Sequence, residues 1–231
     1  MRYRAMGRIP VADERDANYP FRAVLREVSE LRRNDWWDDG WWGDQGYDPH
    51  CVAFAWAHQL ADGPRLVSIF DHRRPGVDTR DLYCAAKIID PWDGDCTRPL
   101  YDGTSVRAGA EVLRRWGLID EYRWAYNAWE VAQAVLTVGP VVVGTTWYEG
   151  MTWPSGQHVM QPTGAVEGGH AYVVNGVDLD KMRFRIKNSW GRDWGTGGRA
   201  YISYDNLNML LKDRGEACVA LQPTVRIGGP T

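Results

Sequence analysis

Cys51 has the clearest chemical context of any residue in this chain. It follows a loop that contains Gly46 and Pro49, and it opens an apolar, Ala-rich stretch that predicts a helix to about Leu60. A thiol in the first helical turn lies near free backbone N–H groups at the positive end of the helix dipole, which favours the nucleophilic thiolate. A single Cys on an apolar helix is more often a small buried hydrophobe, so a catalytic interpretation requires partners elsewhere.

Two later stretches offer such partners. His170 follows Gly168-Gly169 and opens an apolar, β-branched run that predicts a strand, and Asn188 ends a second predicted strand. A His can exchange a proton with a thiol, and an Asn can fix the orientation of the imidazole. Gln45, six residues before Cys51, can donate its amide to an oxyanion. Each residue alone also has an ordinary structural role, as a loop Gln, a core His or a turn-forming Asn.

The order Gln, Cys, His, Asn and the local sequences around these residues resemble the papain-like cysteine peptidases. The most specific block is Lys187-Asn188-Ser189-Trp190-Gly191, followed by Trp194-Gly195 and Gly198. The resemblance covers roughly 45–204. It is strongest to the compact bacterial and phage-type branch, because Asp81-Leu82-Tyr83 and the run 103–121 look like segments of that branch.

The resemblance implies roles for particular residues. Cys51, His170, Asn188 and Gln45 would form the catalytic site, and Trp190 would cover the bond between the His and the Asn. Gly103, Gly169 and Trp190 would contact a peptide or protein substrate. No metal and no cofactor are expected.

The chain also departs from this family around the nucleophile. Asp48 stands where secreted members carry a disulfide Cys, and Val52 replaces a Trp. His50 is an additional His next to the nucleophile. Neighbouring residues on a helix point in different directions, so His170 is kept as the base.

A single α+β domain with a papain-like two-part fold is predicted. A mainly helical part (45–126) precedes a mainly antiparallel β part (127–221), and the cleft between them would have Cys51 on the helical wall and His170 and Asn188 on the sheet wall. Residues 1–44 form an extension with a short amphipathic helix over 21–33, and 222–231 form a tail. Further helices are predicted over 82–89, 106–116 and 128–136, and strands over 140–146, 171–177, 182–187, 199–204 and 216–221.

Composition limits the functional classes. The 231 residues carry a formal net charge of −3, which gives no argument for nucleic acid or an anionic membrane as a partner. The four Cys lack a Cys-x-x-Cys pair, so zinc is not expected. Cys84 and Cys96 are the natural disulfide pair by proximity, but free thiols in a reducing compartment are the simpler expectation.

Localisation and control are also predicted from the sequence. No signal peptide and no long inhibitory segment before Gln45 are apparent. The prediction is a cytoplasmic or virion-associated protein of a bacterium or phage, with its oligomeric state open. The favoured function is a cysteine endopeptidase that works through an acyl-enzyme. Two alternatives remain: a weak or inactive binding protein, such as a virion component, and a thiol amidase acting on cell-wall peptides.

Overall fold

The computed structural model describes residues 6–23, 33–35, 41–70, 75–97, 101–154 and 159–222. Most of the helix predicted over 21–33 lies outside these ranges. The parts that are described form a 3-10 turn, η2 (Phe21–Ala23), and a short strand, β1 (Arg33–Asp35). The prediction of one continuous helix is therefore wrong at both of its ends.

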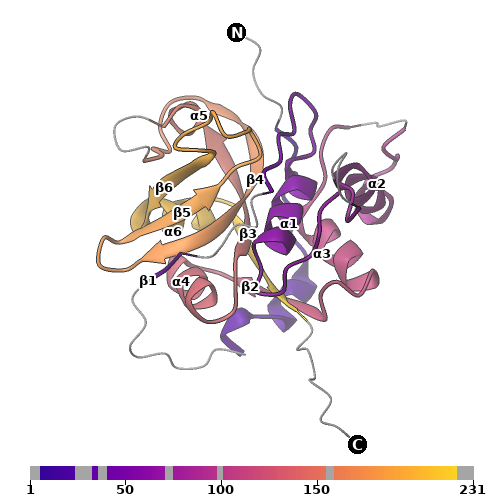
Figure 1. The fold of residues 1–231 in the computed structure, drawn as a ribbon, viewed down its shortest axis with the longest axis horizontal. Helices are drawn as coiled ribbons and strands as arrows, with labels where there is room; N and C mark the ends of the chain where they lie inside the picture. Colours follow the sequence, from indigo (N-terminus) through magenta and orange to yellow (C-terminus); the bar gives the residue numbers. More distant parts are fainter. Residues whose placement is uncertain are drawn as a thin grey trace, which may run out of the picture.

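An antiparallel sheet forms the centre of the fold (Figure 1). Its order is β2-β7-β3-β4-β5-β6, and β1 pairs with β4 as a side branch. The five predicted strands are all present, and β4 begins five residues earlier than predicted. The bounds are β2 (Glu121–Ala125), β3 (Val141–Tyr148), β4 (Val166–Asp178), β5 (Arg183–Lys187), β6 (Arg199–Ser203) and β7 (Glu216–Leu221).

Helices cover both faces of this sheet (Figure 1). One layer contains α1 (Cys51–Asp62), α2 (Thr79–Ile89) and α3 (Val106–Arg115), and the other contains α4 (Ala128–Thr137) and α6 (Tyr204–Lys212). Two short helices, η1 (Glu14–Asn18) and α5 (Glu149–Thr152), complete the described set. Side-chain N-caps begin four of the longer helices, because each cap oxygen accepts a backbone N–H that the first turn leaves unpaired. These caps are Asp78, Ser105, Asn127 and Ser203.

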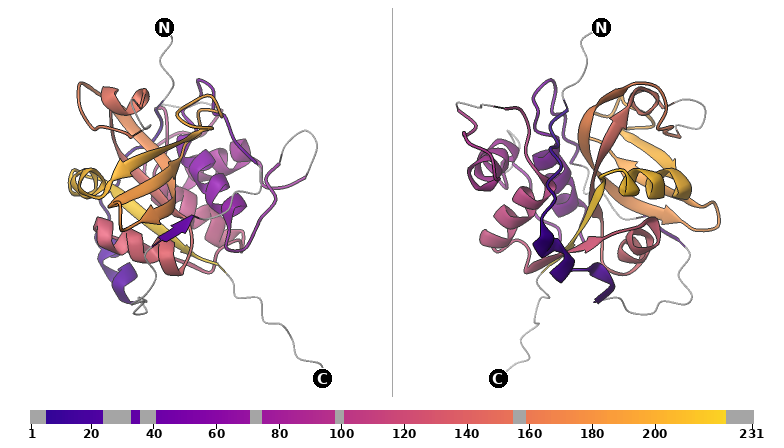
Figure 2. Two further views of the ribbon diagram at one scale, coloured as in Figure 1. Left: turned by 60° about the vertical axis from the view of Figure 1, so that its left-hand side comes forward. Right: turned by 180° about the vertical axis from the view of Figure 1, so that it is seen from behind.

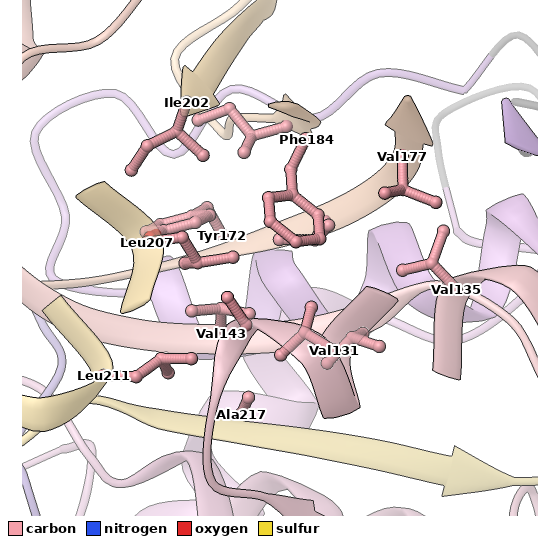
Figure 3. Packing of buried hydrophobic residues seen from close by; sticks show 14 of the residues in the cluster. Val131, Val135, Val143, Tyr172, Val177, Phe184, Ile202, Leu207, Leu211 and Ala217 are labelled. Atoms are coloured by element: carbon pink, nitrogen blue, oxygen red, sulfur yellow. The ribbon is translucent and has the colours of Figure 1, made fainter. Parts of the chain in front are cut away.

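Side-chain alternation divides the interior into two cores. Val141 and Val143 of β3 pack with α4 and α6, whereas Val142 between them packs against α1 and its neighbours. Successive strand residues point to opposite faces, so a strand that is buried on both faces reads as an unbroken apolar run. Figure 3 shows the first core, in which Val131 and Val135 of α4 lie in one cluster with Tyr172 of β4 and Phe184 of β5 on the same side of the sheet.

The sheet begins earlier in the chain than predicted. Strand β2 lies inside the part expected to be mainly helical, and it pairs with β7 through Trp124 and Cys218 among other residues. Tyr122 and Trp124 are buried in the core around α1. This pairing joins residues almost a hundred positions apart, and local sequence carries no information about such a partner.

The four cysteines are not all free. Cys84 and Cys96 form a disulfide, while Cys51 and Cys218 are buried free thiols. The expectation of free thiols throughout is therefore wrong for the first pair, which joins α2 to the loop that follows it. Among the described residues, no helix has the length and apolar character needed to cross a membrane.

A buried ion pair joins the two layers beside the predicted site. Lys187 Nζ donates to Asp62 Oδ1 at 2.6 Å, and both side chains are fully buried. Asn175 Nδ2 donates to the other carboxylate oxygen at 3.1 Å. The pair fixes the end of α1 to β5 immediately before Asn188, and so it helps to set the distance between the walls that carry Cys51 and Asn188.

Lys187→Met should strongly destabilise the protein. The substitution keeps the length of the side chain but leaves the Asp62 carboxylate buried without its cation, which costs about 3–5 kcal/mol in comparable cases. Urea unfolding monitored by Trp fluorescence would measure the loss in the free energy of unfolding. The control is Lys212→Met at the exposed end of α6, which should change that free energy by less than about 0.5 kcal/mol. Equal losses in the two variants would show that the buried pair does not hold the layers together.

Candidate active site

Cys51 is the first residue of α1, and its thiol is fully buried. Backbone N–H groups of Ala171, Gly7 and Val52 donate to the sulfur. The N–H of Val52 belongs to the first helical turn, whose donors lack intrahelical partners. Ala171 directly follows His170 on β4, so the contact brings the His-bearing strand to the thiol.

His170 and Asn188 form the expected hydrogen bond. His170 Nε2 lies 2.8 Å from Asn188 Oδ1, and both residues are fully buried. The backbone N–H of Ser189 donates to the same Oδ1 at 2.8 Å, which fixes the carbonyl end of the amide toward the ring. A carbonyl oxygen only accepts, so Nε2 carries the proton and Nδ1 is the basic nitrogen. Nδ1 has no hydrogen-bond partner among the described residues.

Two tryptophans enclose the imidazole. The Trp190 ring lies 4.9 Å from the His170 ring, and the Trp147 ring lies 4.7 Å from it in an edge-to-face arrangement. Both indoles are almost completely buried. They exclude water from the bond to Asn188, and a hydrogen bond is electrostatically stronger in such a medium of low dielectric constant. Trp190 was expected in this place, whereas Trp147 at the end of β3 was not.

Gln45 is buried at the start of the loop that leads to Cys51. Ser189 Oγ donates to Gln45 Oε1 at 2.6 Å, and Gln45 Nε2 donates to the Asp48 carbonyl at 2.8 Å. The backbone N–H of Gln45 also donates to the Ser189 carbonyl at 2.8 Å. Ser189 therefore contacts Gln45 twice, through its carbonyl oxygen and through its hydroxyl group. The hydroxyl holds the oxygen of the Gln45 amide, so the Nε2 end of that amide points toward the loop that leads to Cys51. Sequence reasoning had assigned no role to Ser189.

The chain's own N-terminal segment, residues 6–9, lies across this site. Arg8 N donates to the Gly169 carbonyl at 3.0 Å, which joins the segment to the sheet wall. Thr104 N donates to the Gly7 carbonyl and Ile9 N donates to the Thr104 carbonyl, both at 2.9 Å, which joins it to the helical wall. In the right-hand view of Figure 2, the indigo chain runs between the helices and the sheet. No long inhibitory segment was apparent before Gln45 in the sequence, yet these four residues are enough to cover the site.

The segment meets the two glycines that were expected to contact a substrate. Gly169 accepts its backbone hydrogen bond as described above. Gly103 has φ +89°, and a Cβ there would lie 2.2 Å from the Gly7 carbonyl oxygen. Gly103 thus leaves space for the close approach of the Gly7 backbone. The backbone hydrogen bonds to the segment are made by the next residue, Thr104, and not by Gly103 as the resemblance implied. Lys87 Nζ donates to the Gly103 carbonyl at 3.2 Å and holds this stretch in place.

Burial beneath the segment favours the neutral forms of both reactive groups. It raises the pKa of Cys51 to about 11, although the backbone N–H groups and the charge of Arg8 act in the opposite direction. Burial likewise lowers the pKa of His170 to about 4, against the hydrogen bond to Asn188. A thiolate–imidazolium pair between Cys51 and His170 is therefore disfavoured while residues 6–9 cover the site.

Three further aromatic rings come from the stretch of chain around the nucleophile, those of Trp41, Trp42 and His50. His50 is not part of the His–Asn pair, since its ring packs at 4.0 Å on Tyr83. Trp41 is buried, and Trp42 is partly exposed with Lys187 Nζ 4.4 Å from the centre of its ring. Trp42 also packs on Gly198, where a Cβ would lie 2.3 Å from the indole. No group of three or more potential metal ligands occurs among the described residues.

Comparisons with known proteins agree with this arrangement. The model of the family described as "Papain family cysteine protease" matches residues 104–216. The cathepsin B-like protein CP3 of Giardia intestinalis is 36% identical over 98 residues, which make up 41% of this chain and 33% of that protein. The match therefore spans only about a third of that relative's length.

Solved structures share the fold over most of the chain. The cysteine protease xylellain from Xylella fastidiosa has a TM-score of 0.71 at 20% identity, with 97% of this chain and 99% of that chain covered. Digestive procathepsin L 3 of Tenebrio molitor has a TM-score of 0.62 at 18% identity, with 94% and 76% covered. The chain therefore shares the fold of these cysteine proteases, and residues 104–216 match the papain family model.

Proposed function

We propose that this protein is a cysteine endopeptidase that cleaves peptide bonds through Cys51, His170 and Asn188. The observation that carries the proposal is the buried bond between His170 Nε2 and Asn188 Oδ1. It leaves the basic Nδ1 on a strand whose next residue, Ala171, donates to the Cys51 sulfur. A nucleophile, a base and a group that orients the base are thus in adjacent positions.

In the proposed reaction, His170 Nδ1 takes the thiol proton and the sulfur attacks the carbonyl carbon of the scissile bond. The negative charge that develops on the carbonyl oxygen is stabilised by the Gln45 amide and the backbone N–H of Cys51. The protonated imidazole then gives its proton to the leaving amine, which leaves a thioester on Cys51. His170 next removes a proton from water, which hydrolyses the thioester to a carboxylic acid and restores the thiol.

The described conformation is the closed form of this enzyme. Gly7 presents a backbone N–H to the Cys51 sulfur, whereas cleavage requires a carbonyl carbon at that place. A substrate can bind only after residues 6–9 have left, and their departure also admits the water that lowers the pKa of Cys51.

The two alternative functions make different predictions about Cys51. A binding protein would leave Cys51 unreactive after the cleft opens, while a cell-wall amidase would cut peptidoglycan and spare ordinary peptides. The test is to treat the protein with a peptidyl epoxide and locate the adduct by mass spectrometry, and then to compare digestion of a peptide library with digestion of purified peptidoglycan. Labelling at Cys51 with cleavage of the library supports the endopeptidase.

The cytoplasmic or virion location stays a prediction, and a Cys84–Cys96 bond found in protein from the native host would count against the cytoplasm.

Gln45→Ala should reduce kcat by roughly 10²- to 10³-fold with little change in KM, because the lost donor acts on the oxyanion that forms during the reaction. Steady-state kinetics on a fluorogenic peptide would measure both constants. Gln45→Glu is the matched variant, since it keeps the size of the side chain but removes the donor, and it should be equally impaired. An unchanged kcat in Gln45→Ala would exclude the oxyanion role.

A further inference from the structure

The stretch 41–45, which ends in Gln45, is held from both walls of the cleft. On the sheet wall, Ser189 contacts Gln45 through its carbonyl oxygen and its hydroxyl group. On the helical wall, the backbone N–H of Gly43 donates to Nε2 of His58 at 3.1 Å. His58 belongs to α1, the helix that begins with Cys51, and its side chain is fully buried. This second contact lies two residues before the proposed oxyanion donor, and it is not used in any step of the proposed reaction.

His58 lies on the same face of α1 as the nucleophile. Cys51, Phe54 and His58 follow one another at spacings of three and four residues, which brings their side chains to one side of the helix. Phe54 also reaches the stretch 41–45, since a Cβ at Gly43 would lie 2.4 Å from its ring. A residue with a side chain at position 43 would therefore push this stretch away from α1. The helix that presents the nucleophile thus also supports the backbone that leads to Gln45.

The imidazole of His58 is neutral and acts as an acceptor in this contact. Because Gly43 donates to Nε2, the ring proton is on Nδ1, which has no hydrogen-bond partner in the described part of the chain. Burial lowers the pKa of His58 well below its ordinary value, and the charge of Lys187 acts in the same direction. The bond to Gly43 is therefore the one hydrogen bond that this ring makes among the described residues.

Packing alone does not account for an imidazole at position 58. The rings of Trp41 and Trp42 lie close to it, with their centres 4.9 and 6.1 Å from that of His58. A polar group that is buried without full pairing destabilises the fold, and an apolar side chain of similar size would avoid that cost. The acceptor offered to Gly43 is the interaction that distinguishes His58 from such an apolar side chain.

A shift of the backbone at Gly43 is passed on to Gln45. Only Asp44 separates the two residues, and Asp44 itself pairs with Trp190 across a single antiparallel bridge. A donor stabilises an oxyanion when it lies about 2.7–3.1 Å from the oxygen, and a misplacement of about 1 Å can slow a reaction by roughly 10²-fold. The anchor at Gly43 therefore bears on the step in which the negative charge forms.

We propose that His58 is a positioning residue for the reaction, which accepts from Gly43 and thereby holds the Gln45 amide where the oxyanion forms. The inference rests on the proposed peptidase function. His58 does not touch the substrate, and its effect passes through Gln45. Its loss should therefore lower kcat, while substrate binding and the reactivity of the Cys51 thiol stay the same.

The test compares three substitutions of His58 in the full chain with Arg8→Ala, which removes the bond from Arg8 to Glu216 and so loosens the segment that covers the site. The amide oxygen of Gln can reach the place of Nε2, the shorter Asn ends at the place of Nδ1, and Leu has no acceptor. On a fluorogenic peptide, His58→Leu and His58→Asn should lower kcat by roughly 10- to 100-fold with KM within about threefold, and His58→Gln should recover most of the loss. Labelling of Cys51 by iodoacetamide, which forms no oxyanion, should be equally fast in all of them.

Gln59→Leu is the matched control, because Gln59 is the next residue of α1, is fully buried and has no side-chain hydrogen bond among the described residues. It should change kcat by less than about threefold. In a chain that already carries Gln45→Ala, His58→Leu should cause little further loss. If His58→Leu does not fold, the Gln and Asn variants still decide, since both are polar and differ in reach. An unchanged kcat, a Gln variant as impaired as the Asn variant, or a loss that multiplies with Gln45→Ala would overturn the inference and make His58 a packing residue only.

A measurement without turnover separates failure of this inference from failure of the peptidase proposal. In the ¹⁵N-labelled full chain, exchange of the Gly43 amide proton with solvent reports the bond to residue 58, and the side-chain amide signal of Gln45 reports where that amide is held. His58→Gln should preserve both, while His58→Asn should speed the exchange and shift the signal. This result would support the anchor even if no peptide were cleaved. Equal exchange or an unshifted Gln45 signal in the Asn variant would overturn it, whether or not cleavage occurs.

Discussion

Cys51→Ala and His170→Ala should each reduce peptide hydrolysis on the order of 10⁶-fold, and the double variant should be little worse than either single one. A nucleophile and its base act as one unit, so the first loss already removes nearly the whole catalytic effect. The comparison is made in the Arg8→Ala background, in which the cleft is expected to open more often. The measurement is kcat/KM on a fluorogenic peptide.

His50→Ala provides the matched control for these variants. His50 is the other imidazole next to the nucleophile, but its ring packs on Tyr83 and lies outside the His170–Asn188 pair. Its removal should change kcat/KM by only a few-fold. If His50→Ala were inactive and His170→Ala active, the assignment of the base would be wrong. If the two single losses multiplied in the double variant, Cys51 and His170 would not act as one unit.

Arg8→Ala should by itself increase the reactivity of Cys51 by roughly 10- to 150-fold. Arg8 Nε donates to Glu216 Oε1 at 2.9 Å, and a hydrogen bond to a charged group stabilises a folded arrangement by about 1.5–3 kcal/mol. Loss of the Arg8–Glu216 bond should therefore shift the equilibrium between the closed and the open cleft by this factor toward the open form. In the closed form, burial raises the pKa of Cys51 to about 11, so at pH 7 almost no thiolate is present and alkylation accelerates only as the pH rises toward that value. Removing the charge of Arg8 also disfavours the thiolate, but burial is the larger influence and opening relieves it.

Iodoacetamide labelling between pH 6 and 11, followed by mass spectrometry, would measure this change. In the variant, the labelling profile of Cys51 should be displaced toward lower pH. Arg15→Ala is the control, because Arg15 belongs to the same N-terminal region but is exposed and pairs with Asp13. Superimposable profiles for Arg8→Ala and the unaltered chain would show that Arg8 does not hold the cleft closed.

The activity test on Cys51 and His170 and the labelling test on Arg8 both depend on how residues 6–9 leave the cleft. The residues that follow the cleft segment are held on the folded domain. Asp13 and Asp16 form ion pairs with Arg107 of α3, and Phe21 is buried in the core. Displacement of residues 6–9 therefore leaves them tethered nearby. The high local concentration of a tethered segment allows it to compete with substrates that bind individually more tightly.

Local chemistry in the sequence was enough to predict most of the elements and to propose the catalytic residues. The helix that follows Cys51 is predicted by an Ala-rich run without Gly or Pro, and Asp78, Ser105 and Asn127 are recognisable caps because capping depends on neighbours only a few residues away. The apolar run of β3 is equally local. Short sequence blocks around Gln45, His170, Asn188 and Trp190 were likewise enough to propose them as site residues, and the structure places these residues close together.

Contacts between distant residues could be decided only by the tertiary structure. The 3.0 Å bond from Arg8 to Gly169 and the 2.9 Å bond from Arg8 to Glu216 each join residues more than 150 positions apart. Nothing in the sequence around Arg8 distinguishes it from the other arginines of the N-terminal region. The pairing of β2 with β7, the Ser189–Gln45 bond and the Lys187–Asp62 pair are hidden for the same reason. Short-range patterns determine which residues can react, while the folded chain decides which of them are covered, because burial and pairing depend on neighbours that are distant in sequence.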